Sequence, residues 1–113
     1  VERMHRYEDG KIAVAPVSLG LMDEAGATEE DMEDIAAFLG QIEGVETSVT
    51  IRELTEGGCK LSVRTSGGLN ATKVCALLGG GGHAAAAGCT VSCTLGEAEE
   101  QILDAIRQVE AHA

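Results

Sequence analysis

The sequence predicts an α/β (α+β) domain, in which helices pack on a small mixed sheet of about four to five strands. Stretches that alternate between apolar and polar residues follow one another with stretches of helical periodicity between them. The length of 113 residues fits one domain spanning residues 1–113. Hydrophobic residues make up 44% of the chain and aromatic residues only 2%, so the expected core is aliphatic.

The first third of the chain predicts one strand and one helix. Residues 10–20 are predicted as a strand, with Pro16 at an edge or an end, and residues 22–27 as a polar connection. Residues 28–44 are predicted as a helix that Thr28 caps and Gly44 ends, with acidic residues in its first turn. Its apolar stripe consists of Met32, Ile35, Ala36, Leu39 and Ile42.

A β-hairpin is expected next, from residues 45–54 and 59–66 joined by a turn at residues 55–58. In the first strand, Val45, Thr47, Val49 and Ile51 share a face. In the second strand, the alternation turns one face toward the core, with Cys59, Leu61 and Val63. The opposite face is a row of hydrogen-bond donors, formed by Lys60, Ser62, Arg64 and Ser66.

The last third predicts a short helix, a strand and a long helix. Residues 67–79 contain the short helix, which Asn70 opens, and residues 89–95 form the strand. Residues 96–113 form the amphipathic last helix, with Ala98, Ile102, Ala105, Ile106 and Val109 facing inward.

The run "LLGGGGHAAAAGC" at residues 77–89 is the most informative stretch of the chain. A flexible linker would be richer in serine and polar residues, whereas leucines and alanines flank these glycines. The run therefore favours an ordered loop where another group approaches the main chain closely, with backbone N–H groups available to an anion. It matches neither the Walker phosphate loop nor the G-x-G-x-x-G dinucleotide pattern.

Two side chains near this run are candidate phosphate ligands. His83 follows the glycines directly, and Arg64 lies on the polar face of a predicted strand. Each has a structural alternative, a hydrogen-bonded histidine for His83 and a solvated salt bridge for Arg64. Ser62 and Ser66 are also compatible with ordinary solvent-facing strand positions, and this interpretation is favoured for Ser62.

Charge and cysteine usage restrict the function further. The chain carries 8 Lys and Arg against 19 Asp and Glu, a net charge of −11, which argues against a broad duplex-binding surface. The scarcity of aromatic residues argues against a stacking platform for single strands. The four cysteines lack Cys-x-x-Cys spacing, which favours reduced thiols in a cytoplasmic protein over a zinc site at Cys89, Cys93 and His83. Neither a signal peptide nor an apolar run of membrane-spanning length is visible, and the start at Val1 indicates that preceding residues are missing.

The stretch "KLSVRTSGGLNATKVCALLGGGGHAAAAGC" at residues 60–89 resembles the DHHA1 domain, the C-terminal substrate-binding domain of DHH-type phosphoesterases. The family's Gly-Gly-Gly-His-x-x-Ala-Ala-Gly hallmark is matched by residues 80–88, and its Ser-x-Arg-Ser stretch by Ser62, Arg64 and Thr65, with Thr in place of the usual Ser. The resemblance extends through residues 42–54 and 96–106. It is closest to the oligoribonuclease and 3′,5′-bisphosphate nucleotide phosphatase group, while cyclic-dinucleotide phosphodiesterases and single-strand exonucleases share the architecture.

The resemblance implies a division of labour between two domains. A missing N-terminal domain would carry the Asp-His-His motif, absent from this chain, and two metal ions, usually manganese. The present chain would then supply neither a catalytic residue, nor a metal ligand, nor a cofactor of its own. It would bind a short oligonucleotide or nucleotide phosphate, and the full-length form could be a homodimer. The residues expected at substrate phosphate are Arg64, Thr65, Ser66, Gly80, Gly81, Gly82 and His83.

The sequence is compatible with two other functions. The chain is also compatible with a free-standing nucleotide-binding or nucleic-acid-binding module. A structural or dimerising α/β domain, in which the glycines only form a tight packing corner, is the third reading. In that case, Arg64→Ala and His83→Ala would change neither ligand binding nor stability much.

Overall fold

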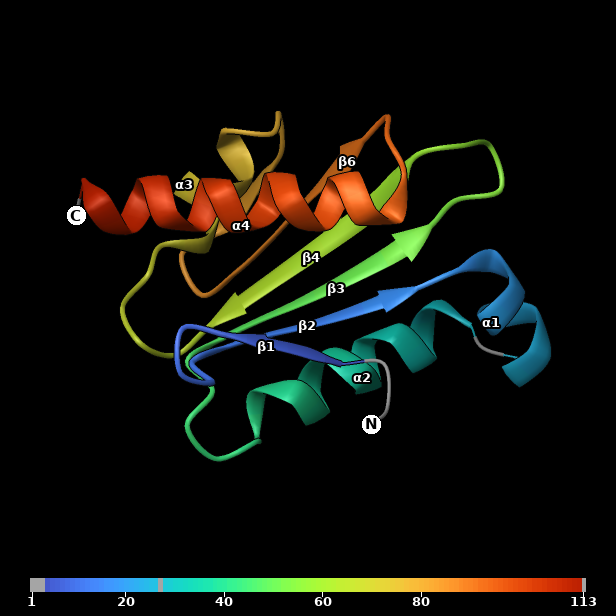
Figure 1. The fold of residues 1–113 in the computed structure, drawn as a ribbon, viewed down its shortest axis with the longest axis horizontal. Coiled ribbons are helices and arrows are strands. Elements are labelled where there is room, and N and C mark those ends of the chain that lie inside the picture. Colours follow the sequence, from blue (N-terminus) through green and yellow to red (C-terminus); the bar gives the residue numbers. More distant parts are fainter. Residues whose placement is uncertain (1–3, 27, 113) are drawn as a thin grey trace.

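The computed structural model describes residues 4–26 and 28–112, which form a mixed six-stranded sheet with helices on both faces (Figure 1). The strand order is β1-β2-β3-β4-β6-β5, in which β2 and β3 are parallel and the other neighbours are antiparallel. The α/β class is confirmed, and the sheet has one or two strands more than expected. The strands are β1 (His5–Tyr7), β2 (Ile12–Val17), β3 (Thr47–Glu53), β4 (Cys59–Thr65), β5 (Gly81–His83) and β6 (Ala86–Val91).

The main core lies between the sheet and two helices, α3 (Ala71–Ala76) and α4 (Leu95–Ala111), which cover the same face in Figure 1. It is aliphatic, as the composition predicts. The predicted inward residues of the last helix are buried, apart from Val109, which is partly buried against this core. The largest fully buried side chains here are Ile51, Leu61, Ile102, Ile106, Val14, Val49, Val63 and Val74.

A second, smaller core lies on the opposite face, under α2 (Glu29–Gly40). Ala13 and Ala15 of β2 alternate with the residues that face the main core, and their small side chains let the helix approach the sheet. Leu39 is fully buried in this core, and Val45 is buried with it. This helix positions the acidic side chains discussed below.

Local capping explains where three of the helices begin. The predicted N-caps Thr28 and Asn70 are confirmed, since their side chains accept hydrogen bonds from Asp31 N and Lys73 N. Thr94 caps α4 in the same way, and both threonines take part in capping boxes.

Several boundaries differ from the prediction. The expected polar connection at 22–27 is largely the helix α1 (Leu19–Ala25), which begins at the cap Ser18 and ends at Gly26 with a φ of 64°; Ala27 lies outside the described residues. The helix predicted to reach Gly44 ends at Gly40, because Gln41 and Ile42 donate to carbonyls three residues back and tighten the chain. The sequence also gave no indication of β1.

The glycine run was expected to be a loop, and it is ordered as a strand. Gly81–His83 form β5, which pairs with β6 at the edge of the sheet. The strand expected at 89–95 instead covers Ala86–Val91, because pairing with β4 draws the earlier residues into the sheet and Thr94 starts α4. The expectation of an ordered segment with close backbone contacts is confirmed, and its geometry is that of a hairpin between β5 and β6.

Candidate functional site

The sheet register brings the two candidate phosphate ligands into one row. Arg64 on β4 is directly opposite Ala86 on β6, and Ala86 is directly opposite His83 on β5. Directly opposite residues in a sheet project to the same face, so Arg64 and His83 flank the methyl group of Ala86. Two strand spacings separate their Cα atoms by about 10 Å. Arg64 contacts Glu33 of α2, so Arg64 and His83 lie on the face of the sheet that α2 partly covers.

Packing explains two of the three glycines expected at the site. A Cβ on Gly80 would lie 2.2 Å from the Gly88 carbonyl oxygen, and one on Gly82 would lie 2.6 Å from Ala87 Cα. These two glycines allow β5 to lie against β6. A Cβ on Gly81 would meet nothing within 4 Å, so the fold itself does not require a glycine at this position. Gly81 therefore leaves exposed backbone that a ligand can approach.

Thr65 ties the end of β4 to the tip of the glycine hairpin. Its hydroxyl donates to the Leu69 carbonyl at 2.7 Å, and its backbone N–H donates to the Ala85 carbonyl at 3.0 Å. The Ala71 N–H donates to the Ala84 carbonyl at 2.8 Å, so the hairpin tip is held from two sides. The structure thus gives Thr65 a positioning role, next to Arg64.

Two shallow recesses lie beside Arg64 on the face partly covered by α2. The smaller, of about 90 Å³, is lined by Arg64, Thr65 and the exposed Ser66, among others. The larger, of about 160 Å³, is lined mainly by polar side chains of α2, β3 and β4, namely Glu30, Glu33, Thr50, Arg52, Lys60 and Ser62, with Met32. The row of donors predicted on β4 therefore faces open space at the edge of α2.

Within residues 4–26 and 28–112, no group of three or more His, Cys, Asp or Glu side chains is placed to hold a metal ion. Cys89, Cys93 and His83 accordingly form no zinc site. All four cysteines are free thiols, and burial raises the pKa of Cys59 and of Cys93. No helix in the described part of the chain is long and apolar enough to cross a bilayer.

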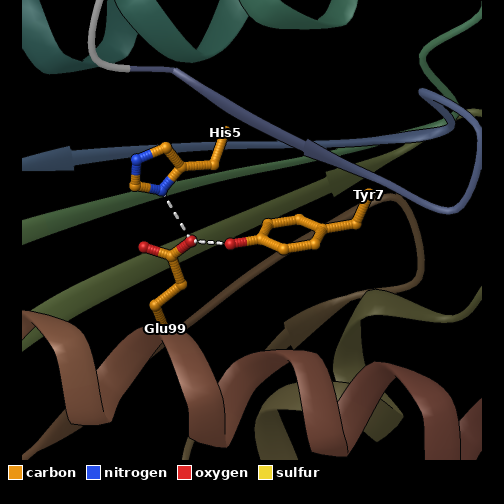
Figure 2. Close-up of polar contacts among 3 residues, drawn as sticks. All are labelled: His5, Tyr7 and Glu99. Carbon is orange, nitrogen blue, oxygen red and sulfur yellow. Dashed lines mark hydrogen bonds and ion pairs between the residues drawn. The ribbon is translucent and has the colours of Figure 1, made fainter.

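A buried carboxylate that sequence reasoning missed links the first strand to the last helix (Figure 2). Glu99 of α4 is only 8% exposed, and one of its oxygens accepts the Tyr7 hydroxyl and lies 2.8 Å from His5 Nδ1. The hydrogen bond to Glu99, followed by burial, raises the pKa of Tyr7 to about 12. The available signal was the position of Glu99 between inward-facing Ala98 and Ile102. The cluster of His5, Tyr7 and Glu99 secures β1 to α4, away from the row formed by Arg64, Ala86 and His83.

Tyr7 is expected to titrate well above the ordinary value of 10.0, near pH 12. Because folding raises this pKa, the stability that Tyr7 contributes is fully present below pH 10 and is lost as pH rises through 12. Tyr7 is the single tyrosine and the chain has no tryptophan, so near-ultraviolet absorbance follows it alone. Glu99→Gln should bring the midpoint down toward 10, whereas Glu100→Gln, at an exposed neighbouring position, should leave it unchanged. A midpoint near 10 in the unmodified chain would contradict the cluster.

The hairpin, the sheet order and the register define an α/β domain that carries Arg64, Ala86 and His83 in one row on a single face of the sheet. The family model of the DHHA1 domain matches residues 9–111, and the chain belongs to this family. The resemblance seen in the sequence is thereby confirmed over nearly the whole chain.

The chain is similar to one curated relative and to two solved structures. The chain is 41% identical over 93 residues to the "Bifunctional oligoribonuclease and PAP phosphatase NrnA" of Thermus thermophilus, a match that covers 81% of this chain and 28% of that protein. An exopolyphosphatase-related protein from Bacteroides fragilis superimposes with a TM-score of 0.85 at 26% identity, over 95% of this chain and 32% of that one. The pGpG-specific phosphodiesterase PggH from Vibrio shares the fold, with a TM-score of 0.62 at 19% identity, over 99% of this chain and 36% of that one. The chain thus spans about a third of the length of these proteins.

Proposed function

We propose that this chain is the phosphate-binding and nucleotide-binding domain of a metal-dependent DHH-type phosphoesterase that hydrolyses short oligonucleotides or nucleotide phosphates. Membership of the DHHA1 family and the identity with an oligoribonuclease and nucleotide phosphatase support this proposal. The chain spans about a quarter of that relative, which leaves room for a separate catalytic domain in the whole protein. In this proposal the present domain grips the substrate and does not cleave it, and the whole enzyme acts in the cytoplasm.

The observation that carries the proposal is the row of Arg64, Ala86 and His83. A guanidinium can bind two phosphate oxygens at once, and an imidazole N–H can donate to a third. The methyl group of Ala86 and the open backbone at Gly81 leave space between them. Ser66 lines the recess beside Arg64, and Gly80 and Gly82 hold the hairpin in place. A chain with a net charge of −11 can bind an anion only through such a local set of donors.

Hydrolysis itself would belong to the other domain of the whole enzyme. The described residues do not fit a metal site, so the proposal assigns the two manganese ions to an N-terminal Asp-His-His domain. When bound there, such ions activate water and stabilise the leaving oxygen. What the present chain contributes is the positioning of the phosphate by Arg64 and His83. A homodimer of the full-length enzyme is compatible with this arrangement.

Arg64→Ala and His83→Ala are each expected to weaken binding of a 5′-phosphorylated dinucleotide by at least about tenfold, because each removes a charge-assisted or polar bond to phosphate. The measurement is an NMR titration of the 113-residue chain at low salt, which detects millimolar affinities. Arg107→Ala is the matched control, since Arg107 pairs with Glu8 on another part of the surface and is 50% exposed. It should bind as the unmodified chain does.

The three functions that the sequence leaves as alternatives predict different results in this titration. Loss of binding in both variants supports the phosphate site. Binding that survives in both variants would point to a nucleotide module that uses another surface. No binding at millimolar ligand by any version would favour a structural domain, and assay of the full-length enzyme with the same two substitutions would then decide whether the row matters for turnover.

A further inference from the structure

Arg64 already has an anionic partner in the ligand-free protein. Its guanidinium donates to the carboxylate of Glu33 at 2.5 Å. The two side chains come from different layers, Glu33 from α2 and Arg64 from β4. The helix residues Met32 and Ala36 are buried against the sheet. Glu33 therefore lies at the edge of α2, above the end of β4 that carries Arg64.

This ion pair is weak enough to rearrange. The Arg64 side chain is 41% exposed and that of Glu33 is 67% exposed, and ion pairs this exposed to solvent stabilise a protein only weakly. Arg64 also has donor N–H groups beyond the one that contacts Glu33. A phosphate can therefore bind Arg64 whether Glu33 stays in place or swings away.

In both cases the phosphate binds close to a carboxylate. The repulsion between them grows with the charge of the ligand, which is about −1 for a phosphodiester and about −1.5 to −2 for a phosphomonoester near pH 7. Breaking the ion pair costs the same for either ligand. Arg64 attracts the more highly charged ligand more strongly, and repulsion from Glu33 offsets part of that preference. Glu46, which lines the recess of Arg64, acts in the same direction. Lys60, on the same face four residues along β4, is about 13 Å from Arg64 at the Cα atoms and offsets the effect little.

We propose that Glu33 is a specificity-determining residue, which biases the Arg64 site toward a singly charged phosphodiester and against a doubly charged terminal or free phosphate. The inference rests on the proposed function and refines it. Its consequence for an enzyme that cleaves oligonucleotides is that the diester substrate competes better with the monoester product. The domain would then release the product phosphate more readily than an isolated arginine site would.

A pair of ligands that differ by one charge tests the proposal. A nucleoside 5′-monophosphate and its 5′-phosphate methyl ester have nearly the same shape, and only the ester is limited to one negative charge. Dissociation constants of both are measured by NMR titration of the 113-residue chain at low salt, above pH 7. Glu33→Gln keeps the size and polarity of the side chain and removes its charge.

Glu33→Gln is expected to tighten binding of the monophosphate by about two- to fivefold more than binding of the ester, which is the size of one charge–charge term near a surface. Asp34→Asn is the control, because it removes the same charge one position along α2. It should change the ratio of the two dissociation constants, monophosphate over ester, much less. A ratio that shifts equally in Glu33→Gln and Asp34→Asn would overturn the proposal. Weaker binding of both ligands by Glu33→Gln would also overturn it, since Glu33 would then serve to hold Arg64 in place.

Arg64→Ala separates this proposal from the proposed function. If Arg64→Ala weakens both ligands while Glu33→Gln leaves their ratio unchanged, the phosphate site stands and the role of Glu33 is wrong. If Arg64→Ala leaves both ligands unaffected, the phosphate site itself is wrong, and the role of Glu33 is wrong with it.

Discussion

Leu39→Ala is expected to lower the free energy of unfolding by about 2–5 kcal/mol, the range for removing a large buried side chain. Leu39 is the largest fully buried side chain in the small core under α2. Its partners Ala13 and Ala15 are too small to fill the cavity by moving toward it. Urea unfolding followed by circular dichroism measures the change.

Phe38→Ala is the matched control for this substitution. Phe38 is the neighbouring residue of α2 and is 53% exposed, so its loss should change stability by no more than about 0.5 kcal/mol. Equal effects of the two substitutions would contradict the position of α2 on the sheet. Leu39→Ala should also loosen α2, which carries Glu33, and so reduce the discrimination between the phosphate monoester and diester.

Gly80→Ala is expected to cost about 1–3 kcal/mol of stability through overpacking, and to weaken phosphate binding more than tenfold. The added Cβ would lie 2.2 Å from the Gly88 carbonyl oxygen and 2.5 Å from Cys89 Cβ. Both contacts are with β6 rather than with the end of a flexible side chain, so β5 must move away. That movement takes His83 out of the row with Arg64, which the titration described above would detect.

Gly81→Ala distinguishes the packing role of the glycines from a role in ligand approach, within the same strand β5. Its Cβ would meet nothing within 4 Å and its φ is not positive, so stability should change by no more than about 0.5 kcal/mol. Weaker phosphate binding without loss of stability would support close approach of the ligand at Gly81. Destabilisation as large as that of Gly80→Ala would contradict the geometry of the hairpin.

Local signals in the sequence predicted most of the secondary structure. Thr28 and Asn70 start helices because a short side-chain oxygen satisfies backbone N–H groups within three residues, an interaction that depends on nearby residues alone. The alternation of Cys59, Leu61 and Val63 likewise identified the buried face of β4. The helix α1 was missed although Ser18 and Gly26 bracket it, because its polar residues suggested a connection.

Partner strands decided the elements that local signals did not predict. The β1 strand is three residues long and exists through its pairing with β2 and the contacts of His5 and Tyr7 with Glu99, more than ninety positions away in the chain. The glycine run forms β5 because β6 lies beside it, and the beginning of β6 is set by pairing with β4. Glycine has little intrinsic preference for a strand, so its neighbours in space determine its conformation.

Composition, periodicity and a motif within one stretch of chain were enough to predict the fold class, the aliphatic core, the family and the candidate phosphate-binding residues. They could not predict that Arg64 and His83 share a face, that Gly80 and Gly82 serve packing while Gly81 does not, or that Glu33 contacts Arg64. The physical reason is that strand register and helix docking join residues far apart in sequence. The charge surrounding a phosphate ligand depends on those distant residues.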